Sequence, residues 1–192
     1  MEYTSSLSSR RMSLCASVLA ALGLVTACGG TADSATGDSG ANGSPVRSTA
    51  AATSGRCHTS ELAASVGRNN PGAGQENFPI VLTNRSSRVC TLHGYPGTAF
   101  VNASGTQIGA NPKRSSGQAA TVTLKPGQSA WAGLTFSNPH VSGAKSANPV
   151  DLLVTPPNER DPLKVRWTAG KVPVSGNASS VFLTVFGPGT GA

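Results

Sequence analysis

The chain has 192 residues and a net charge of +7, from 15 Lys and Arg against 8 Asp and Glu, yet only 12% of its residues are charged. About 130 residues have globular composition, which is enough for one domain that buries roughly two thirds of its unfolded surface and too few for two. The apolar stretch 12–25 has 14 residues, fewer than the about 20 that span a bilayer, so we expect no transmembrane helix.

The first 27 residues have the organisation of a bacterial export signal. Arg10 and Arg11 form a basic region, the apolar stretch follows, and residues 24–28 read Leu-Val-Thr-Ala-Cys. This run resembles a lipoprotein cleavage site, which implies that the Cys28 sulfur takes a diacylglycerol and that Cys28 becomes the new N-terminus. Two alternatives stay open: ordinary secretion in which Cys28 has no role, and twin-arginine export of a prefolded protein. We expect a lipid anchor at the extracytoplasmic face of the cell membrane.

A change of composition marks the next segment, 28–56. Gly, Ala, Ser and Thr make up 21 of the 28 residues from 29 to 56, and Val46 is the only larger apolar side chain. Such a segment cannot bury enough surface to offset the entropy lost on ordering. The composition therefore predicts a disordered tether between the anchor and a folded domain over 57–187, which a flexible tail over 188–192 follows.

Of the four cysteines, Cys15 lies in the predicted signal peptide and Cys28 is the predicted lipidation site. Cys57 and Cys90 remain as a pair in the folded region. An even remainder in an exported chain favours a structural disulfide. A redox or metal pair is the alternative, but it usually has closer spacing.

The folded region has the pattern of β-strands. Residues 78–83 alternate between large apolar and other side chains, and residues 163–167 place Leu163, Val165 and Trp167 on one face with Lys164 and Arg166 on the other. No helical period appears after the signal. The pattern predicts about nine strands, over 61–66, 78–83, 89–92, 98–101, 120–124, 129–136, 150–155, 163–167 and 180–186.

Turn residues separate these segments at Asn84–Ser87, Ser104–Gly105, Pro126–Gly127, Pro156–Pro157 and 175–177. Many short strands with regular turns in a chain of this size predict an all-β, antiparallel sandwich. The segment 181–186 is apolar at both alternating positions, so we expect it at the centre of a sheet or under a covering loop.

Four features point to a known family: Cys57, Asn84, the run 90–97 (Cys-Thr-Leu-His-Gly-Tyr-Pro-Gly) and the run 124–130 (Leu-Lys-Pro-Gly-Gln-Ser-Ala). Together they resemble the lipoprotein family of high-GC Gram-positive bacteria that carries the domain of unknown function 4232. The resemblance implies an immunoglobulin-like sandwich and a bridge between the two cysteines, and it implies no activity. Gly94, Tyr95, Pro96 and Gly97 predict a tight turn, with Pro96 fixing φ, Gly97 adopting a conformation that other residues avoid, and Tyr95 packing over the bridge.

The sequence offers little for catalysis. The folded region has three histidines, His58, His93 and His140, but no Gly-x-Ser-x-Gly motif. None of the histidines has a spacing to another ligand that indicates a metal site. We therefore expect no enzyme, no cofactor and no metal, with an uncharacterised hydrolase as the alternative.

Charge is the one indication of a ligand. From residue 57 onward, eleven Lys and Arg stand against five Asp and Glu. Outside the membrane such a domain faces anionic head groups and phosphate-bearing wall polymers. We expect an anion-binding patch formed by Arg85, Arg88, Lys113, Arg114, Lys164 and Arg166. The alternative is that these charges are dispersed for solubility.

Two non-catalytic functions remain open. The first is a binding module for a cell-envelope component, an anionic wall polymer or an envelope protein, because sandwiches commonly present binding loops on a rigid scaffold. The second is an accessory or structural lipoprotein that contacts other proteins by an exposed sheet edge. Both predict a monomeric domain at the membrane and no nucleic-acid partner.

Overall fold

A computed structural model of the chain describes residues 55–191. The predicted signal peptide, Cys28 and the tether up to residue 54 lie outside the described residues. From 55 to 191 the regular secondary structure is almost entirely β-strand, with one 3-10 turn, η1 (Thr59–Glu61), and one short helix, α1 (Pro139–Ser142). The all-β prediction is confirmed. Among the described residues, no helix has the length and apolarity needed to cross a membrane.

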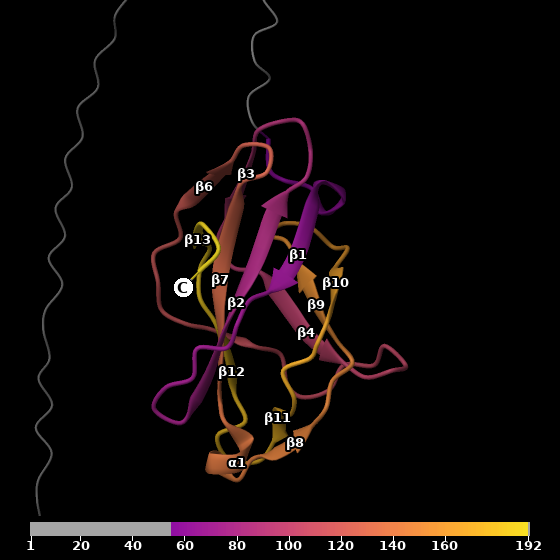
Figure 1. Cartoon of the computed structure of the whole chain (residues 1–192), viewed down its shortest axis with the longest axis vertical. Helices are drawn as coiled ribbons and strands as arrows, with labels where there is room; N and C mark the ends of the chain where they lie inside the picture. Colours follow the sequence, from indigo (N-terminus) through magenta and orange to yellow (C-terminus); the bar gives the residue numbers. More distant parts are fainter. Residues whose placement is uncertain (1–54, 192) are drawn as a thin grey trace, which may run out of the picture. The chain divides into compact units, whose positions relative to one another are not determined.

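One layer of the sandwich is a six-stranded sheet (Figure 1). Its order is β1-β2-β7-β12-β5, and β13 also pairs with β7. All pairs are antiparallel except β12 with β5. β2 and β7 form the centre and pair from Gln75 opposite Ser137 to Thr83 opposite Ser129. The bounds are β1 (Leu62–Val66), β2 (Gln75–Asn84), β5 (Lys113–Arg114), β7 (Ser129–Ser137), β12 (Val181–Leu183) and β13 (Gly187–Pro188).

The second layer is a three-stranded sheet in the order β10-β9-β4, made of β4 (Gly97–Val101), β9 (Asp151–Thr155) and β10 (Leu163–Arg166). β10 lies beside β1, where the two layers meet. Two short ladders close the opposite ends of the sandwich in Figure 1. One pairs β3 (Cys90–His93) with β6 (Thr121–Leu124), and the other pairs β8 (Lys145–Ala147) with β11 (Val172–Ser175).

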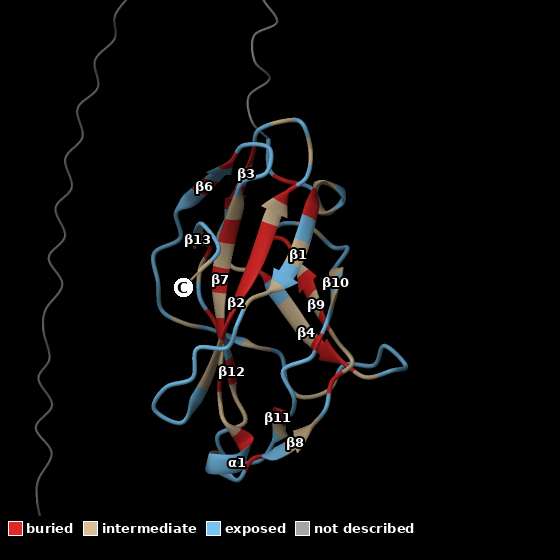
Figure 2. Cartoon of the chain, viewed as in Figure 1, coloured by how far each residue is buried: buried red, intermediate tan, exposed pale blue. Residues whose placement is uncertain are grey.

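The inward-facing side chains of both layers form the core, which appears as the buried stripes of Figure 2. Its aromatic part joins Phe78 and Phe136 of the six-stranded sheet to Phe100 of β4 and to Trp167, which directly follows β10. The Trp167 ring lies 4.9 Å from Phe78 and 4.9 Å from Phe100, both edge-on. We call these four residues the aromatic layer. The indole N–H of the buried Trp167 has a hydrogen-bond partner, because Nε1 donates to Gly170 O at 2.8 Å.

The predicted strand 180–186 is interrupted. β12 and β13 run along the same side of β7, but Val185 and Phe186 together stand opposite Ala132, which is the two-against-one geometry of a β-bulge. At the bulge the Phe186 N–H donates to Gly94 O at 2.9 Å. β12 does lie inside the sheet, yet its Phe182 is 38% exposed. The expected position inside a sheet is therefore found for 181–183, with Phe182 on the outer face.

Both ends of the folded region extend further than the composition indicated. Gly55 O accepts from Thr91 N–H and Arg56 bridges Thr91, so the fold begins before residue 57. At the other end, Pro188 belongs to β13 and Gly189 N–H donates to Ser129 O at 2.9 Å. Residues 188–191 were expected to be a flexible tail. They lie against β7 instead, because the chain after the bulge returns to the hydrogen-bonding edge of β7.

Candidate functional site

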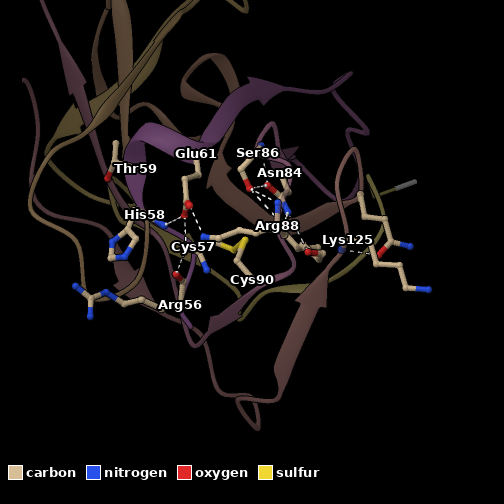
Figure 3. The surroundings of a disulfide bond; sticks show 12 residues. Arg56, Cys57, His58, Thr59, Glu61, Asn84, Ser86, Arg88, Cys90 and Lys125 are labelled. Atoms are coloured by element: carbon tan, nitrogen blue, oxygen red, sulfur yellow. Dashed lines mark hydrogen bonds and ion pairs between the residues drawn. A yellow bond between two sulfur atoms is a disulfide. The ribbon is translucent and has the colours of Figure 1, made fainter. Parts of the chain in front are cut away.

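The predicted disulfide is formed between Cys57 and Cys90, whose Cα atoms are 4.9 Å apart. Both cysteines are fully buried. Cys57 N–H also donates to Thr91 O at 2.9 Å, so the bridge and the backbone together fix the start of the domain to β3. Figure 3 shows charged and polar side chains gathered around this bridge.

Glu159, from the loop between β9 and β10, closes one side of this region. Its carboxylate accepts from Arg56 Nε at 3.0 Å and from the Thr59 N–H at 3.2 Å, and it lies 3.1 Å from His58 Nδ1. The Arg56 guanidinium, together with Thr59 and His58, lowers the pKa of Glu159 from 4.5 to about 2. A loop about a hundred residues away is thereby held against the first residues of the domain.

Glu61 and Arg88 form a second ion pair on the other side of the bridge, drawn with dashed lines in Figure 3. Arg88 also donates from Nη2 to Arg56 O at 2.8 Å, and Glu61 accepts from the His58 N–H at 2.8 Å. Hydrogen bonding from Arg88 lowers the pKa of Glu61, and burial acts in the opposite direction. We call Arg56, His58, Glu61, Arg88 and Glu159 the charged collar of the disulfide.

Asn84 lies beneath the collar and is the one fully buried polar side chain among residues 55–191. Its amide nitrogen donates to Arg88 O at 2.8 Å and to Leu124 O at 3.0 Å, while its oxygen accepts from the Ser86 N–H and hydroxyl. Asn84 therefore replaces backbone partners where β2 ends and holds the loop that carries Arg88.

The described surface has a groove of about 490 Å³ near the collar, where the β3–β4, β5–β6 and β9–β10 loops meet. Tyr95 forms part of its lining, and the Arg114 guanidinium carbon lies 5.1 Å from the centre of the Tyr95 ring. The Tyr95 hydroxyl donates to Ser115 O at 2.6 Å, so the ring is fixed to the strand that carries Arg114. His93 also lines the groove. We call this hollow the Tyr95 groove.

The opposite side of the Tyr95 groove is the turn Pro156–Glu159, which also lines it. Glu159 N–H donates to Pro156 O at 3.2 Å, and Asn158 has φ +61°, as the third position of a type II turn requires. The turn directs Glu159 toward Arg56, which neutralises its charge. Arg114 has no ion pair among residues 55–191, so the groove has an unmatched positive charge.

The predicted turn Gly94–Gly97 lies between β3 and β4 at this groove, but its glycines have other roles than expected. Gly94 has φ +99° and makes the bend, whereas Gly97 is an extended residue of β4 opposite Thr155. A Cβ on Gly97 would approach Thr155 Cβ to 3.3 Å, so Gly97 permits close strand pairing. The Tyr95 contacts described here are with Arg114 and Ser115.

The six cations of the expected patch are dispersed. Arg85 and Arg88 are in the β2–β3 loop, and Arg88 is paired with Glu61. Lys113 and Arg114 form β5 at one edge of the six-stranded sheet, while Lys164 and Arg166 are on β10, beside β1 at the opposite edge. The structure thus brings Arg114 to the Tyr95 groove and does not gather the six residues there.

The histidines have simple surroundings. His58 belongs to the collar, His93 Nδ1 lies 3.3 Å from Thr121 Oγ1, and His140 is an exposed residue of α1. No group of three or more His, Cys, Asp or Glu side chains suited to a metal ion occurs over 55–191. The turn predicted at Pro156–Pro157 is confirmed by the bend at Asn158, whereas no local pattern in the sequence predicted the charged collar.

The fold and the bridge define the chain as an all-β sandwich domain closed by one disulfide. The family described as a domain of unknown function, DUF4232, matches residues 57–184, and the chain belongs to this family. No curated protein and no solved structure matches the chain.

Proposed function

We propose that this protein is a lipid-anchored, extracytoplasmic binding module whose Tyr95 groove takes an anionic group of a cell-envelope component. The observation that carries the proposal is Arg114. It is exposed, stacked on Tyr95 and without an acidic partner among the described residues, and it lines a groove built from three loops. A guanidinium whose orientation is fixed by stacking on an aromatic ring can form charge-assisted hydrogen bonds with a phosphate or carboxylate group.

The anchor rests on the sequence of the first 28 residues and accounts for the ligand class. A domain held at the outer surface of a membrane meets wall polymers that carry phosphate and carboxylate groups. The disulfide between Cys57 and Cys90 fits an oxidising compartment.

The test measures co-sedimentation of the purified full chain with wall polymer from its host, across a salt series. We expect Arg114→Gln to weaken binding about tenfold, as the loss of one charge-assisted contact predicts, and binding of the wild type to weaken as salt increases.

Lys164→Gln is the matched control, because it removes the same charge from β10 at the opposite edge. Unchanged binding by Arg114→Gln, or equal losses in both variants, would reject the groove as the site. Mass spectrometry of protein from the host tests the anchor separately, since a lipidated chain begins at Cys28.

A further inference from the structure

The outer face of the six-stranded sheet has a second hollow, centred on Gly133 of β7. Alternate residues of β7 face the core, so Trp131, Gly133 and Thr135 lie on the outer face. Gly133 stands opposite Pro79 of β2, and Thr184 N–H donates to its carbonyl at 3.0 Å. The side chains of Trp131 and Thr135 therefore flank a position that has none.

This hollow has a volume of about 250 Å³ and shares no lining residue with the Tyr95 groove. A Cβ on Gly133 would lie 3.3 Å from Thr184 Cγ2 and 3.9 Å from Trp131 Cζ3, so glycine at this position keeps the floor open. The φ of Gly133 is outside the left-handed region, and the backbone therefore does not require glycine. We call the hollow the Trp131 pocket.

One polar group at the rim of the Trp131 pocket has no partner within residues 55–191. The indole presents Cζ3 toward Gly133, while its Nε1 lies toward Gly187, which does not line the pocket. Asn70 is exposed. Its backbone N–H donates to Asn77 O at 2.9 Å and its carbonyl accepts from Asn77 Nδ2 at 3.1 Å, while its side-chain amide has no partner within residues 55–191. The pocket thus offers the Asn70 amide beside an apolar surface.

The indole is held in place by the last residues of the chain. A Cβ on Gly191 would approach Trp131 Cε3 to 3.1 Å and Pro79 Cβ to 2.7 Å, so only glycine fits between the two rings. Gly187 pairs with Trp131 across β13 and β7. An aromatic ring fixed before binding loses little conformational entropy when a ligand arrives.

We propose that the Trp131 pocket binds one neutral sugar ring of a glycan. A pyranose has apolar C–H groups, which suit the indole edge and the Pro79 ring, and hydroxyl groups, which suit the Asn70 amide. No Lys, Arg, Asp or Glu lines the pocket, so an uncharged ligand matches it and an ion does not. The volume is below the roughly 300 to 1,000 Å³ of pockets for drug-sized ligands, which fits a single ring.

Tryptophan fluorescence tests this directly. The chain has two tryptophans, and Trp167 is buried in the aromatic layer, so a ligand at the pocket changes the Trp131 signal. The full chain, in a detergent without sugar head groups, is titrated with cellotetraose, chitotetraose and glucose. We expect a saturable, salt-independent change of tryptophan fluorescence with a tetraose at millimolar concentration. Free glucose should bind more weakly than the tetraoses, because the proposed ligand is one ring within a glycan.

Gly133→Val fills the pocket and should abolish the change, while Gly55→Val, the same substitution at the disulfide end, should leave it intact. If Gly133→Val does not fold, Asn70→Ala on the rim should still weaken binding at least about threefold. Absence of a saturable fluorescence change with all three sugars overturns the proposal. It is also overturned if Asn70→Ala binds the tetraose as well as the wild type does, or if trialanine produces the same change as the sugars. Arg114→Gln should leave the titration unchanged, so this proposal and the anionic groove fail independently.

Discussion

The aromatic layer and the disulfide end belong to one core but depend on different forces. In the aromatic layer, Phe78, Phe100, Phe136 and Trp167 contact one another edge-on or stacked, with no charged group among them. At the disulfide end, order depends on a covalent bond, the charged collar and the buried amide of Asn84. Packing is insensitive to pH and redox state, whereas ion pairs and a disulfide are not, so the two regions should respond to different perturbations.

Phe136→Ala should have the largest effect, because Phe136 is fully buried and contacts three other rings. We expect a loss of about 3 to 5 kcal/mol in the free energy of unfolding, measured by urea denaturation. Phe182→Ala, on the exposed face of β12, is the control and should cost about 1 kcal/mol or less. Similar losses at the two positions would contradict the assignment of the aromatic layer to the core.

Removing the bridge by Cys57→Ala with Cys90→Ala should cost about 3 to 4 kcal/mol, as the chain-entropy relation gives for this loop. The loop spans a sequence separation of 33 residues. A reductant should destabilise the wild type by a similar amount and leave the double variant unchanged. Hydrogen exchange should accelerate first in β3 and least in β9. Uniform acceleration would show that the two regions are not separable.

Asn84→Ala should cost about 2 to 3 kcal/mol, because it removes a buried donor from the Leu124 carbonyl and one of the donors of the part-buried Arg88 carbonyl. Ser86→Ala removes one part-buried hydroxyl from the same cluster and should cost about 1 kcal/mol. Thermal or urea denaturation measures both. If Ser86→Ala matched Asn84→Ala, the loop rather than the buried amide would be the source of the stability.

The smallest expected effect is the pH dependence that Glu159 confers. Its pKa is about 2 in the folded chain and 4.5 in the unfolded chain, so the unfolded state binds the proton first as the pH falls. The stability from Glu159 is complete above pH 4.5 and is lost as the pH falls toward 2. Glu159→Gln should therefore show a flatter dependence of unfolding free energy on pH in this window.

Asp161→Asn serves as the control for Glu159→Gln. It removes a charge from the same loop, but the Asp161 side chain makes no ion pair or hydrogen bond within 55–191. The unfolding free energy of Asp161→Asn should therefore depend on pH in the same way as that of the wild type. Parallel curves for the wild type and Glu159→Gln would show that the Glu159 carboxylate contributes nothing to the pH dependence of folding.

The sequence by itself determined the all-β character of the domain, most of its longer strands and, where side chains alternate clearly, the face that packs on the core. Alternation over 78–83 and 163–167 predicted β2 and β10 with the correct faces, because side chains on a strand alternate between its two surfaces. The even number of cysteines in the folded region, together with the expectation of export, predicted the disulfide that the structure contains. The strands β5, β8, β11 and β13 were not predicted, because segments of two to four residues give at most a weak alternation.

Only the tertiary structure decided which distant residues meet. Arg56 and Glu159 are separated by 103 residues, and no local pattern relates them. The positions of Arg114 at one sheet edge and Lys164 beside the other follow from strand order, which a list of strands does not contain. The Trp131 pocket likewise depends on Thr184 and the last residues returning to β7, because side-chain periodicity fixes a face while the path of the chain fixes its neighbours.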